Sequence, residues 1–229
     1  MGETDRSVFR ASNTTTAMKL KEKIVQESMR LFSTKGYCST SINDILITAD
    51  TSKGGFYNHF ASKEILFHHV LKEAQDIWRE QALAGLDEID SPVGKIEKLL
   101  ENYRDRYLKD NVTFPGGCIF VTFSVELDYL QPHLAQEVNE GFIGVKGMIG
   151  RLLEAGKEQG ELPATVKSGD LAEVLFAGML GASVIYGVDR SNETLDRTIN
   201  SLIDHLRQQR IPQENIREFL AHADSVAYS

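Results

Sequence analysis

Apolar residues along this chain recur at the three- and four-residue spacing of helices. Ile42, Ile45, Leu46 and Ala49 fall on one helical face for this reason. Similar stripes predict further helices over about residues 17–35, 53–60, 62–80, 92–109, 118–129, 132–159, 174–188 and 191–210, and Pro212 opens a short last one. No region has the alternating pattern of strands, so the predicted fold class is all-α.

Two short helices separated by a tight turn are predicted over residues 42–60. Asp50 ends the first helix, since Asp tolerates the left-handed turn conformation better than most residues. Ser52 can then cap the second helix by accepting hydrogen bonds from its unpaired amides. On that helix Phe56 and Phe60, four residues apart, face one way. The arrangement is typical of a helix-turn-helix.

The other face of the second short helix carries groups that suit DNA. Lys53 offers a charge for a phosphate, while Tyr57 and His59 offer ring surface and hydrogen bonds. Gly54 is a poor helix former, and a close approach of the backbone to another molecule is one reason for its presence. The alternative is that these side chains form the solvated face of a small helical bundle.

The segment from about residue 19 to 70 resembles the DNA-binding signature of the tetracycline-repressor (TetR) family of bacterial transcription regulators. The matching residues are Gly36, Tyr37, Thr40, Ser41, Asp44, Ile45, Ala49, Ser52, Lys53, Gly54, Phe56, Tyr57, His59, Phe60, Ser62, Lys63, Glu64 and Leu66. The chain departs from the family at Leu46, Asp50 and Thr51, where a small residue, Gly and an apolar residue are usual. The DNA-contacting residues that we predict are Ser39, Thr40, Ser52, Lys53, Gly54, Tyr57, His59 and Lys63.

The distribution of charge restricts where DNA can bind. The formal net charge of the 229 residues is −8, which is unusual for a nucleic-acid-binding protein. Residues 1–80 carry 11 Lys or Arg and 10 Asp or Glu, whereas residues 81–229 carry 14 and 23. We therefore expect DNA contact only in the N-terminal part, with the acidic remainder facing away from the duplex.

The predicted domain organisation follows from these patterns and from the resemblance. Residues 1–16 are rich in Ser and Thr and are predicted to be a disordered tail. Residues 17–62 would form the DNA-binding domain, and residues 63–229 a ligand-binding and dimerisation domain. The helix over 62–80 has no breaker, so it joins the two parts and is a candidate transmission element.

A second set of residues is predicted to form a homodimer interface. The segment 174–188 is uncharged but too short and too rich in Gly for a membrane span, so a buried helix is the better interpretation. The resemblance implies that this helix and the next form a four-helix bundle between subunits, and the alternative is an intrachain core helix. The predicted interface residues are Ala177, Gly178, Gly181, Ala182, Ile185, Leu195, Ile199, Leu202 and Leu206.

Aromatic residues of the second part suit a pocket for an apolar or aromatic effector. The candidate pocket residues are Trp78, Tyr103, Tyr107, Phe114, Cys118, Phe120, Phe123, Phe142 and Met148, most of which would equally serve as core. If Cys118 begins a helix, its thiol pKa would fall and thiolate chemistry would become possible. A buried, inert cysteine is the alternative.

Enzymatic sites are not indicated by the remaining motifs. The glycines of 141–150 follow no strand, and the spacing from Gly150 to Lys157 is one residue too long for a phosphate loop. The adjacent His68 and His69 leave a helix in different directions, so they do not readily share a metal ion. We therefore predict no catalytic residues, no metal and no cofactor.

The function predicted from these features is that of a ligand-responsive, DNA-binding transcription regulator. In this family such a protein is most often a repressor that a small effector releases from operator DNA. One alternative is a repressor that senses oxidants or electrophiles through Cys118, and another is a helical small-molecule carrier that binds no DNA. The N-terminus lacks a signal-peptide pattern and the two cysteines form no CxxC motif, which indicates the reducing cytoplasm.

Overall fold

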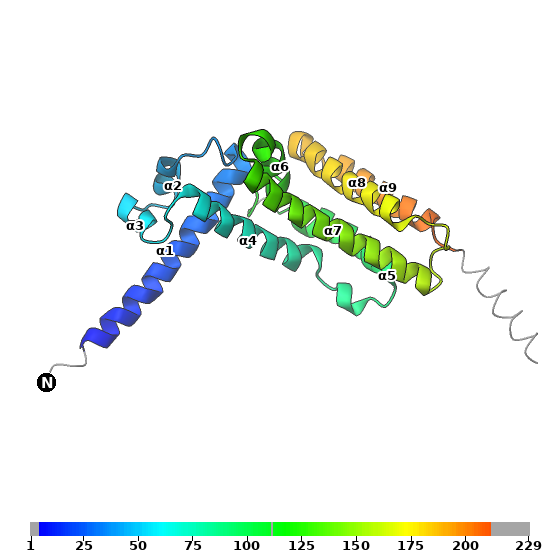
Figure 1. Cartoon of the computed structure of the whole chain (residues 1–229), viewed down its shortest axis with the longest axis horizontal. Helices are drawn as coiled ribbons and strands as arrows, with labels where there is room; N and C mark the ends of the chain where they lie inside the picture. The colour runs from blue at the N-terminus through cyan, green and yellow to red at the C-terminus, as the bar shows by residue number, and fades with distance from the viewer. Residues whose placement is uncertain (1–4, 111, 212–229) are drawn as a thin grey trace, which may run out of the picture. The chain divides into compact units, whose positions relative to one another are not determined.

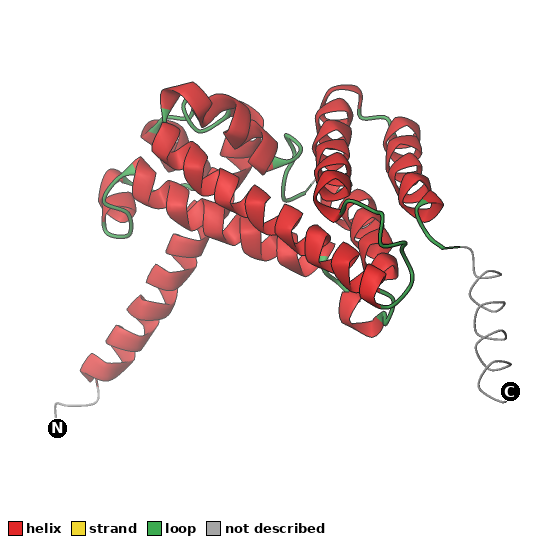
Figure 2. Ribbon diagram, turned by 45° about the vertical axis from the view of Figure 1, so that its right-hand side comes forward, coloured by secondary structure: helices red, strands yellow, loops and turns green. Residues whose placement is uncertain are grey.

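The computed structural model describes residues 5–110 and 112–211, so the short helix predicted after Pro212 lies outside the described residues (Figure 1). In chain order the elements are α1 (Asp5–Lys35), α2 (Ile42–Thr48), α3 (Lys53–Tyr57), α4 (Lys63–Ala82), the 3-10 turn η1 (Leu86–Glu88), α5 (Pro92–Asn102), the π-helical segment η2 (Tyr103–Leu108), α6 (Ile119–Leu130), α7 (Pro132–Glu158), α8 (Ser168–Asp189) and α9 (Asn192–Gln208). Figure 2 shows helices and loops and no strand in this part of the chain, which confirms the all-α prediction.

The chain folds into two compact units. Among the described residues, the first comprises those up to Glu80 together with Leu108–Glu140, and the second comprises Gln81–Tyr107 together with those from Gly141 to residue 211. The helix-turn-helix therefore shares a unit with α6 and the first part of α7. The boundary expected from the sequence lies between residues 62 and 63 instead, because apolar stripes do not reveal which later helices return to the N-terminal ones.

α1 is longer than its sequence pattern suggests. It begins at Asp5, whereas the composition predicts a disordered tail over residues 1–16. Residues 1–4 lie outside the described residues, and over residues 5–16 a helix stands where the tail was expected, since neither glycine nor proline between Asp5 and Lys35 stops it. Gly36 then ends α1 as predicted, in the left-handed conformation at a φ of 82°.

An aromatic cluster forms part of the core of the first unit. The ring centroid of Phe123 on α6 lies 4.9 Å from that of Phe67 on α4 and 6.2 Å from that of Phe32 on α1. Such tilted and edge-on aromatic pairs stabilise a core beyond the area they bury. Phe123 is fully buried among these rings. Phe123 thus contributes to the core between α1, α4 and α6, and its predicted role in an effector pocket stays a prediction.

The loop that precedes α6 lies directly against the end of α1. A Cβ atom on Gly116 would overlap the backbone carbonyl of Ser33, so only glycine permits this approach. The Gly116 amide also lies 3.4 Å from the Ser33 hydroxyl, which accepts a long hydrogen bond. The first unit is therefore closed by a contact between two backbones as well as by its aromatic core.

In the second unit α8 and α9 pack against each other. Gly178 leaves room for Leu202, because a Cβ atom at Gly178 would lie 2.5 Å from a Leu202 methyl carbon. By length and composition α8 could cross a membrane, but one of its faces, which includes Leu175 and Met179, is buried inside the unit. We therefore interpret α8 as a core helix.

Four residues predicted for a dimer interface lie in the interior of the subunit. Ala182, Leu195, Ile199 and Leu206 are at most 2 % exposed within a single chain. They cannot contact a second subunit in this arrangement, which corrects their assignment. The apolar stripe of α9 packs on its own chain, and the spacing of a stripe does not indicate whether it will face the same subunit or a partner.

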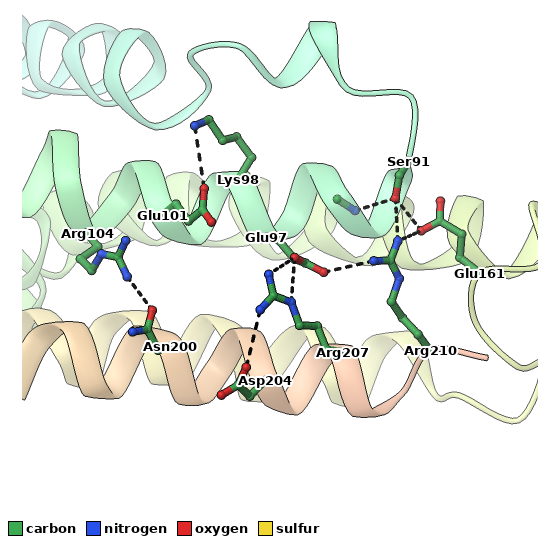
Figure 3. Close-up of polar contacts among 11 residues, drawn as sticks. Ser91, Glu97, Lys98, Glu101, Arg104, Glu161, Asn200, Asp204, Arg207 and Arg210 are labelled. Atoms are coloured by element: carbon green, nitrogen blue, oxygen red, sulfur yellow. Dashed lines mark hydrogen bonds and ion pairs between the residues drawn. The ribbon is translucent and has the colours of Figure 1, made fainter. Parts of the chain in front are cut away.

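Charged side chains connect three segments of the second unit (Figure 3). Arg207 near the end of α9 donates to the Glu97 carboxylate of α5 at 2.7 Å. Arg210 donates to Glu161, in the loop after α7, at 2.7 Å and to the hydroxyl of Ser91, the N-cap of α5, at 2.9 Å. We call these five residues the arginine network.

The helix predicted over residues 92–109 changes its hydrogen-bonding pattern at Tyr103. α5 ends at Asn102 and is followed by the π-helical segment η2. The buried Asn102 side chain donates to the carbonyls of Ala82 at 3.1 Å and Ala84 at 2.8 Å, and so pairs carbonyls at the end of α4. The π-helical turn was not predicted, because apolar spacing does not report which backbone groups are hydrogen-bonded.

Candidate DNA-reading surface

α2 begins with a reciprocal cap. The Ser41 hydroxyl accepts a hydrogen bond from the Asp44 amide at 3.1 Å, and the Asp44 carboxylate accepts one from the Ser41 amide at 2.8 Å. This capping box satisfies two amides that a helix start leaves unpaired. Hydrogen bonds from Ser41 hold the pKa of Asp44 below its usual value, so the cap is present at neutral pH.

The turn between α2 and α3 has the conformation predicted for Asp50. Asp50 lies in the left-handed region at a φ of 51°. Its amide donates to the Ile47 carbonyl at 3.2 Å, and the Thr51 amide donates to the Leu46 carbonyl at 2.9 Å. These two bonds form a Schellman motif, which usually has glycine at the left-handed position. Asp therefore replaces the family's usual Gly without changing the type of turn.

α3 is anchored through two rings. Phe56 and Phe60 are fully buried, as their spacing predicts. The hydroxyl of Ser52 accepts a hydrogen bond from the Gly55 amide at 3.1 Å, which confirms its predicted role as a cap. α3 itself is only Lys53–Tyr57, shorter than the predicted 53–60, because the chain turns away after Tyr57.

The outward face of α3 carries three of the eight predicted DNA-contacting residues. Tyr57 is 51 % exposed, and Lys53 and Gly54 are exposed beside it. Ser39 and Ser52 are also exposed, and His59 is half-buried. Two residues that the sequence did not single out extend this surface, namely Ile47 and Asn58, both exposed. Their exposure depends on how α2 and α3 pack, which spacing alone does not give.

The two glycines of α3 have different surroundings. A Cβ atom on Gly55 would overlap the hydroxyl oxygen of Thr51, so this glycine is explained by packing within the chain. A Cβ atom on Gly54 would meet only the Ser52 hydroxyl, at 3.8 Å, which is an ordinary contact. Nothing in the described part of the chain therefore requires glycine at position 54, even though glycine weakens a helix.

Two predicted DNA contacts are instead internal. Thr40 is fully buried, and its hydroxyl donates to the Gly36 carbonyl at 2.6 Å. The Lys63 ammonium donates to the carbonyls of Tyr37 and Thr40, both at 2.9 Å. These findings correct both assignments, because the polar atoms of the two side chains are engaged by the turn between α1 and α2.

Lys63 and the adjacent Tyr37 both have shifted pKa values. The Lys63 ammonium lies 4.3 Å from the centroid of the Tyr37 ring, which favours a cation. Burial lowers the pKa of Lys63. Burial, together with the nearby carboxylate of Glu64, raises the pKa of Tyr37 to about 12. Tyr37 therefore remains neutral at physiological pH.

The turn between α1 and α2 also bonds to a glutamate that could not be predicted from the sequence. The Glu126 carboxylate on α6 accepts hydrogen bonds from the amides of Tyr37 at 2.6 Å and Cys38 at 2.9 Å. Burial, and then Glu126, raise the pKa of the Cys38 thiol, so the thiol form is favoured. Glu126 is nearly ninety residues from its partners in sequence, and no local pattern marks it.

The residues predicted to line an effector pocket divide between the two units. The first unit holds Trp78, Phe114, Cys118, Phe120 and Phe123, and the second holds Tyr103, Tyr107, Phe142 and Met148. Tyr103 and Tyr107 stack with centroids 5.6 Å apart, and Phe142 meets the ring of Phe176 at 5.4 Å. Cys118 is the N-cap of α6, as expected, and is buried. The grouping of these residues around one ligand stays a prediction.

Comparison with known protein families agrees with this geometry. Residues 24–70 match the model described as bacterial regulatory proteins of the tetR family, and residues 92–202 match the tetracyclin repressor-like C-terminal domain. The chain belongs to the TetR family. TetR proteins are DNA-binding transcription regulators of the helix-turn-helix type, and the protein is accordingly a regulator and not an enzyme.

Named relatives of this TetR protein are transcription regulators. It is 29 % identical to the HTH-type transcriptional repressor DhaR of Mycobacterium sp. (strain GP1), over 82 % of this chain and 92 % of DhaR. It is 28 % identical to the HTH-type transcriptional repressor NemR of Escherichia coli, over 78 % of this chain and 89 % of NemR.

Solved TetR structures share the fold. A regulator from Chloroflexus aurantiacus superimposes with a TM-score of 0.79 at 28 % identity, over 86 % of this chain and all of that one. A cysteine mutant of the TetR regulator CifR, solved with 26-base-pair operator DNA, superimposes with a TM-score of 0.70 at 21 % identity, over 79 % of this chain and 94 % of CifR. The CifR likeness concerns the fold alone.

Proposed function

We propose that this TetR protein is a cytoplasmic, homodimeric repressor that binds operator DNA through α3 and is released by a small effector. The observation that carries the proposal is that α3 has one buried, aromatic face and one exposed, polar face. Phe56 and Phe60 fix the helix to the first unit, while Lys53 and Tyr57 point away from it. A lysine for phosphate and a phenol for a base edge or phosphate are the groups that a recognition helix needs.

Gly54 adds independent support for DNA contact. Its Cβ position is open within the chain, so an intramolecular clash does not explain the glycine. A backbone that must approach a duplex closely would explain it, since a side chain there would stand between helix and DNA. The named repressors DhaR and NemR, and the CifR complex with operator DNA, support the same interpretation.

A dimer would present two copies of α3 to one face of the duplex. Two-fold operators place half-sites about 34–36 Å apart, one turn of the DNA helix. After the four buried residues are removed, the predicted interface retains Ala177, Gly178, Gly181, Ile185 and Leu202. Of these, Ile185 is an exposed apolar side chain on α8. Val174, Val184 and Val188 of α8 are exposed as well, and several exposed apolar residues on one helix are typical of a subunit contact.

An apolar or aromatic effector would bind among the remaining candidate pocket residues. The tyrosine pair at Tyr103 and Tyr107 lies in a π-helical turn, a feature often found at functional sites. We propose that effector binding lowers operator affinity, typically by about 5- to 150-fold. Mass spectrometry of ligand that co-purifies with the protein would identify the effector class.

A second candidate is a repressor that senses electrophiles through Cys118. The supporting observation is that Cys118 begins α6, where a helix N-terminus favours a thiolate. Its burial opposes rapid reaction, since only a small part of the residue meets solvent. Release of a bound duplex by an electrophile from the wild-type protein, but not from Cys118→Ser, would favour this candidate.

The test of DNA reading uses a duplex that the wild-type protein selects from a random library. We expect Tyr57→Ala and Lys53→Ala each to weaken binding about tenfold, because each removes a direct contact. Lys53→Ala should also reduce the slope of affinity against salt by about one, the signature of a lost phosphate contact. Fluorescence anisotropy over a range of salt concentrations measures both quantities.

Lys167→Ala is the matched control for the charge change. Lys167 is an exposed lysine of the second unit, so its loss should leave affinity and salt slope unchanged. If the wild-type protein selects and retards no duplex, the carrier without DNA binding becomes the better interpretation. If Lys53→Ala and Tyr57→Ala bind as the wild type does, the assignment of α3 as the reading helix is wrong.

A further inference from the structure

The turn between α1 and α2 is held from two sides by oppositely charged side chains. On its amide side, the Glu126 carboxylate accepts from Tyr37 at 2.6 Å and from Cys38 at 2.9 Å. On its carbonyl side, the Lys63 ammonium donates to Tyr37 and Thr40, both at 2.9 Å. Charge-assisted bonds to backbone groups are among the stronger hydrogen bonds in proteins. We call Lys63 and Glu126 the turn clasp.

Gly36 fits the turn to the carboxylate. Its left-handed conformation, at a φ of 82°, lets the amides of Tyr37 and Cys38 point toward one anion. A Cβ atom on Gly36 would lie 2.5 to 2.6 Å from the carboxyl atoms of Glu126. Glycine is therefore favoured here by the backbone angle, and its missing side chain leaves room for the end of the Glu126 side chain to reach both amides.

The clasped turn determines where α2 starts. Directly after Thr40, Ser41 begins α2 with its capping box, and the Schellman turn at Asp50 then fixes the start of α3. Because each of these junctions is conformationally defined, a change in the turn would be carried to α3. We propose that Glu126, acting with Lys63, is a positioning residue for DNA binding, which holds the reading helix in register from α6.

Both residues of the turn clasp lie on helices that lead along the chain into the second unit. Lys63 is the first residue of α4, which runs on into the second unit, and α6 is followed after Gln131 by α7, which also runs on into it. Each arm of the clasp thus belongs to a helical path that continues into the second unit. Withdrawal of either arm would loosen the same turn.

The inference rests on the proposed DNA-binding function, but its first test does not. We expect Glu126→Ala to raise the exchange rates of the Tyr37 and Cys38 amides at least about tenfold, because both lose their acceptor. Hydrogen–deuterium exchange of the full chain, read by NMR, measures this directly. Asp128→Ala is the matched control, since it removes the same charge from an exposed position on the same helix and should leave both amides protected.

The second test measures affinity for the duplex that the wild-type protein selects. Glu126→Ala should weaken binding by about tenfold, and Asp128→Ala should not. Glu126→Asp separates position from charge, because it keeps the carboxylate but shortens its reach by one methylene. A positioning role predicts that Glu126→Asp behaves like Glu126→Ala, whereas a general effect of negative charge predicts wild-type binding.

Lys63→Met provides the same test from the carbonyl side, should Glu126→Ala be unstable, because it keeps the contact with the Tyr37 ring while removing the donor. Both side chains hold one turn, so their effects should not be independent. The double variant Lys63→Met/Glu126→Ala should therefore lose less DNA affinity than the product of the two single fold-losses. Unchanged exchange in Glu126→Ala would overturn the clasp. Raised exchange with unchanged affinity, in variants whose melting temperature is that of the wild type, would overturn the positioning role. Absence of DNA binding by the wild type would instead refute the proposed function and leave the exchange result intact.

Discussion

Two regions of this protein use charged side chains in different ways. In the first unit, Lys63 and Glu126 bond to backbone groups of a single turn. In the second unit, the arginine network joins side chains to side chains, as between Glu97 and Arg207 (Figure 3). The turn clasp therefore fixes the path of the chain, whereas the network fixes helices that are already formed relative to one another.

The charged groups of the two regions also differ in their exposure to water and salt. Lys63 is half-buried and its pKa is lowered by burial, so its bonds are partly shielded from water. The Glu97 side chain is only 12 % exposed, but its partner Arg207 is 53 % exposed. Interactions with exposed charges are screened by salt, and those of shielded charges much less. We therefore expect the stability of the first unit to be sensitive to changes in backbone contacts, and that of the second unit to be sensitive to ionic strength.

The largest effect is expected from an added methyl group in the first unit. Gly116→Ala places a Cβ atom against the Ser33 carbonyl, so the backbone of α1 or of the loop must shift. We expect a loss of about 1–3 kcal/mol in the free energy of unfolding, as for overpacked cores. Urea titration followed by circular dichroism measures it.

Gly150→Ala is the matched control for that substitution. No atom outside its own helical backbone lies within 4 Å of the added Cβ position, so alanine should stabilise α7 by about 0.5–1 kcal/mol. Equal effects of Gly116→Ala and Gly150→Ala would remove the distinction between a backbone contact and an ordinary surface glycine.

An intermediate effect is expected in the arginine network. Glu97→Ala leaves Arg207 without its 2.7 Å partner and should lower the free energy of unfolding by about 1–2 kcal/mol, less than a fully buried pair because Arg207 is exposed. The loss should shrink as sodium chloride is raised, which urea titrations at several salt concentrations would reveal.

Glu193→Ala supplies the control for the network. Glu193 pairs with Arg197 at 2.6 Å, but both side chains are largely exposed, so no measurable change is expected. If the free energy of unfolding that Glu97→Ala loses did not change with salt, the arginine network would not be the salt-sensitive region that we expect.

The smallest effect is expected from pH. Burial, and then the nearby charges of Lys21 and His68, lower the pKa of His69 from its ordinary value of 6.5. The folded state thus binds the proton less readily than the unfolded state, so stability falls as the pH drops from above 6.5 toward the lowered pKa. The difference in urea midpoint between about pH 7.5 and 5.5 should be smaller in His69→Gln than in the wild type. An equal pH dependence of the two proteins would contradict this assignment.

Local features were predicted well from the sequence. The cap at Ser52, the left-handed Asp50 and the inward-facing Phe56 and Phe60 all depend on residues within a few positions of one another. Errors arose where a polar side chain found its partner inside the protein. Thr40 and Lys63 have the chemistry of DNA contacts, yet Thr40 bonds to Gly36, four residues away, and Lys63 to carbonyls more than twenty residues away.

The sequence by itself determined the helices, their caps and the order of chemical groups on α3, because hydrogen bonding and side-chain spacing within a helix are local. Only the tertiary structure decided that α6 returns to α1, that Glu126 meets the amides of the first turn, and that Leu195 and Ile199 face their own chain. Those contacts join residues far apart in sequence, and many pairings of apolar stripes are compatible with the same periodicity. Close packing permits only those pairings whose shapes fit. The left-handed backbone at Gly36 and the Ser33 carbonyl beside Gly116 mark two places where another residue would not fit.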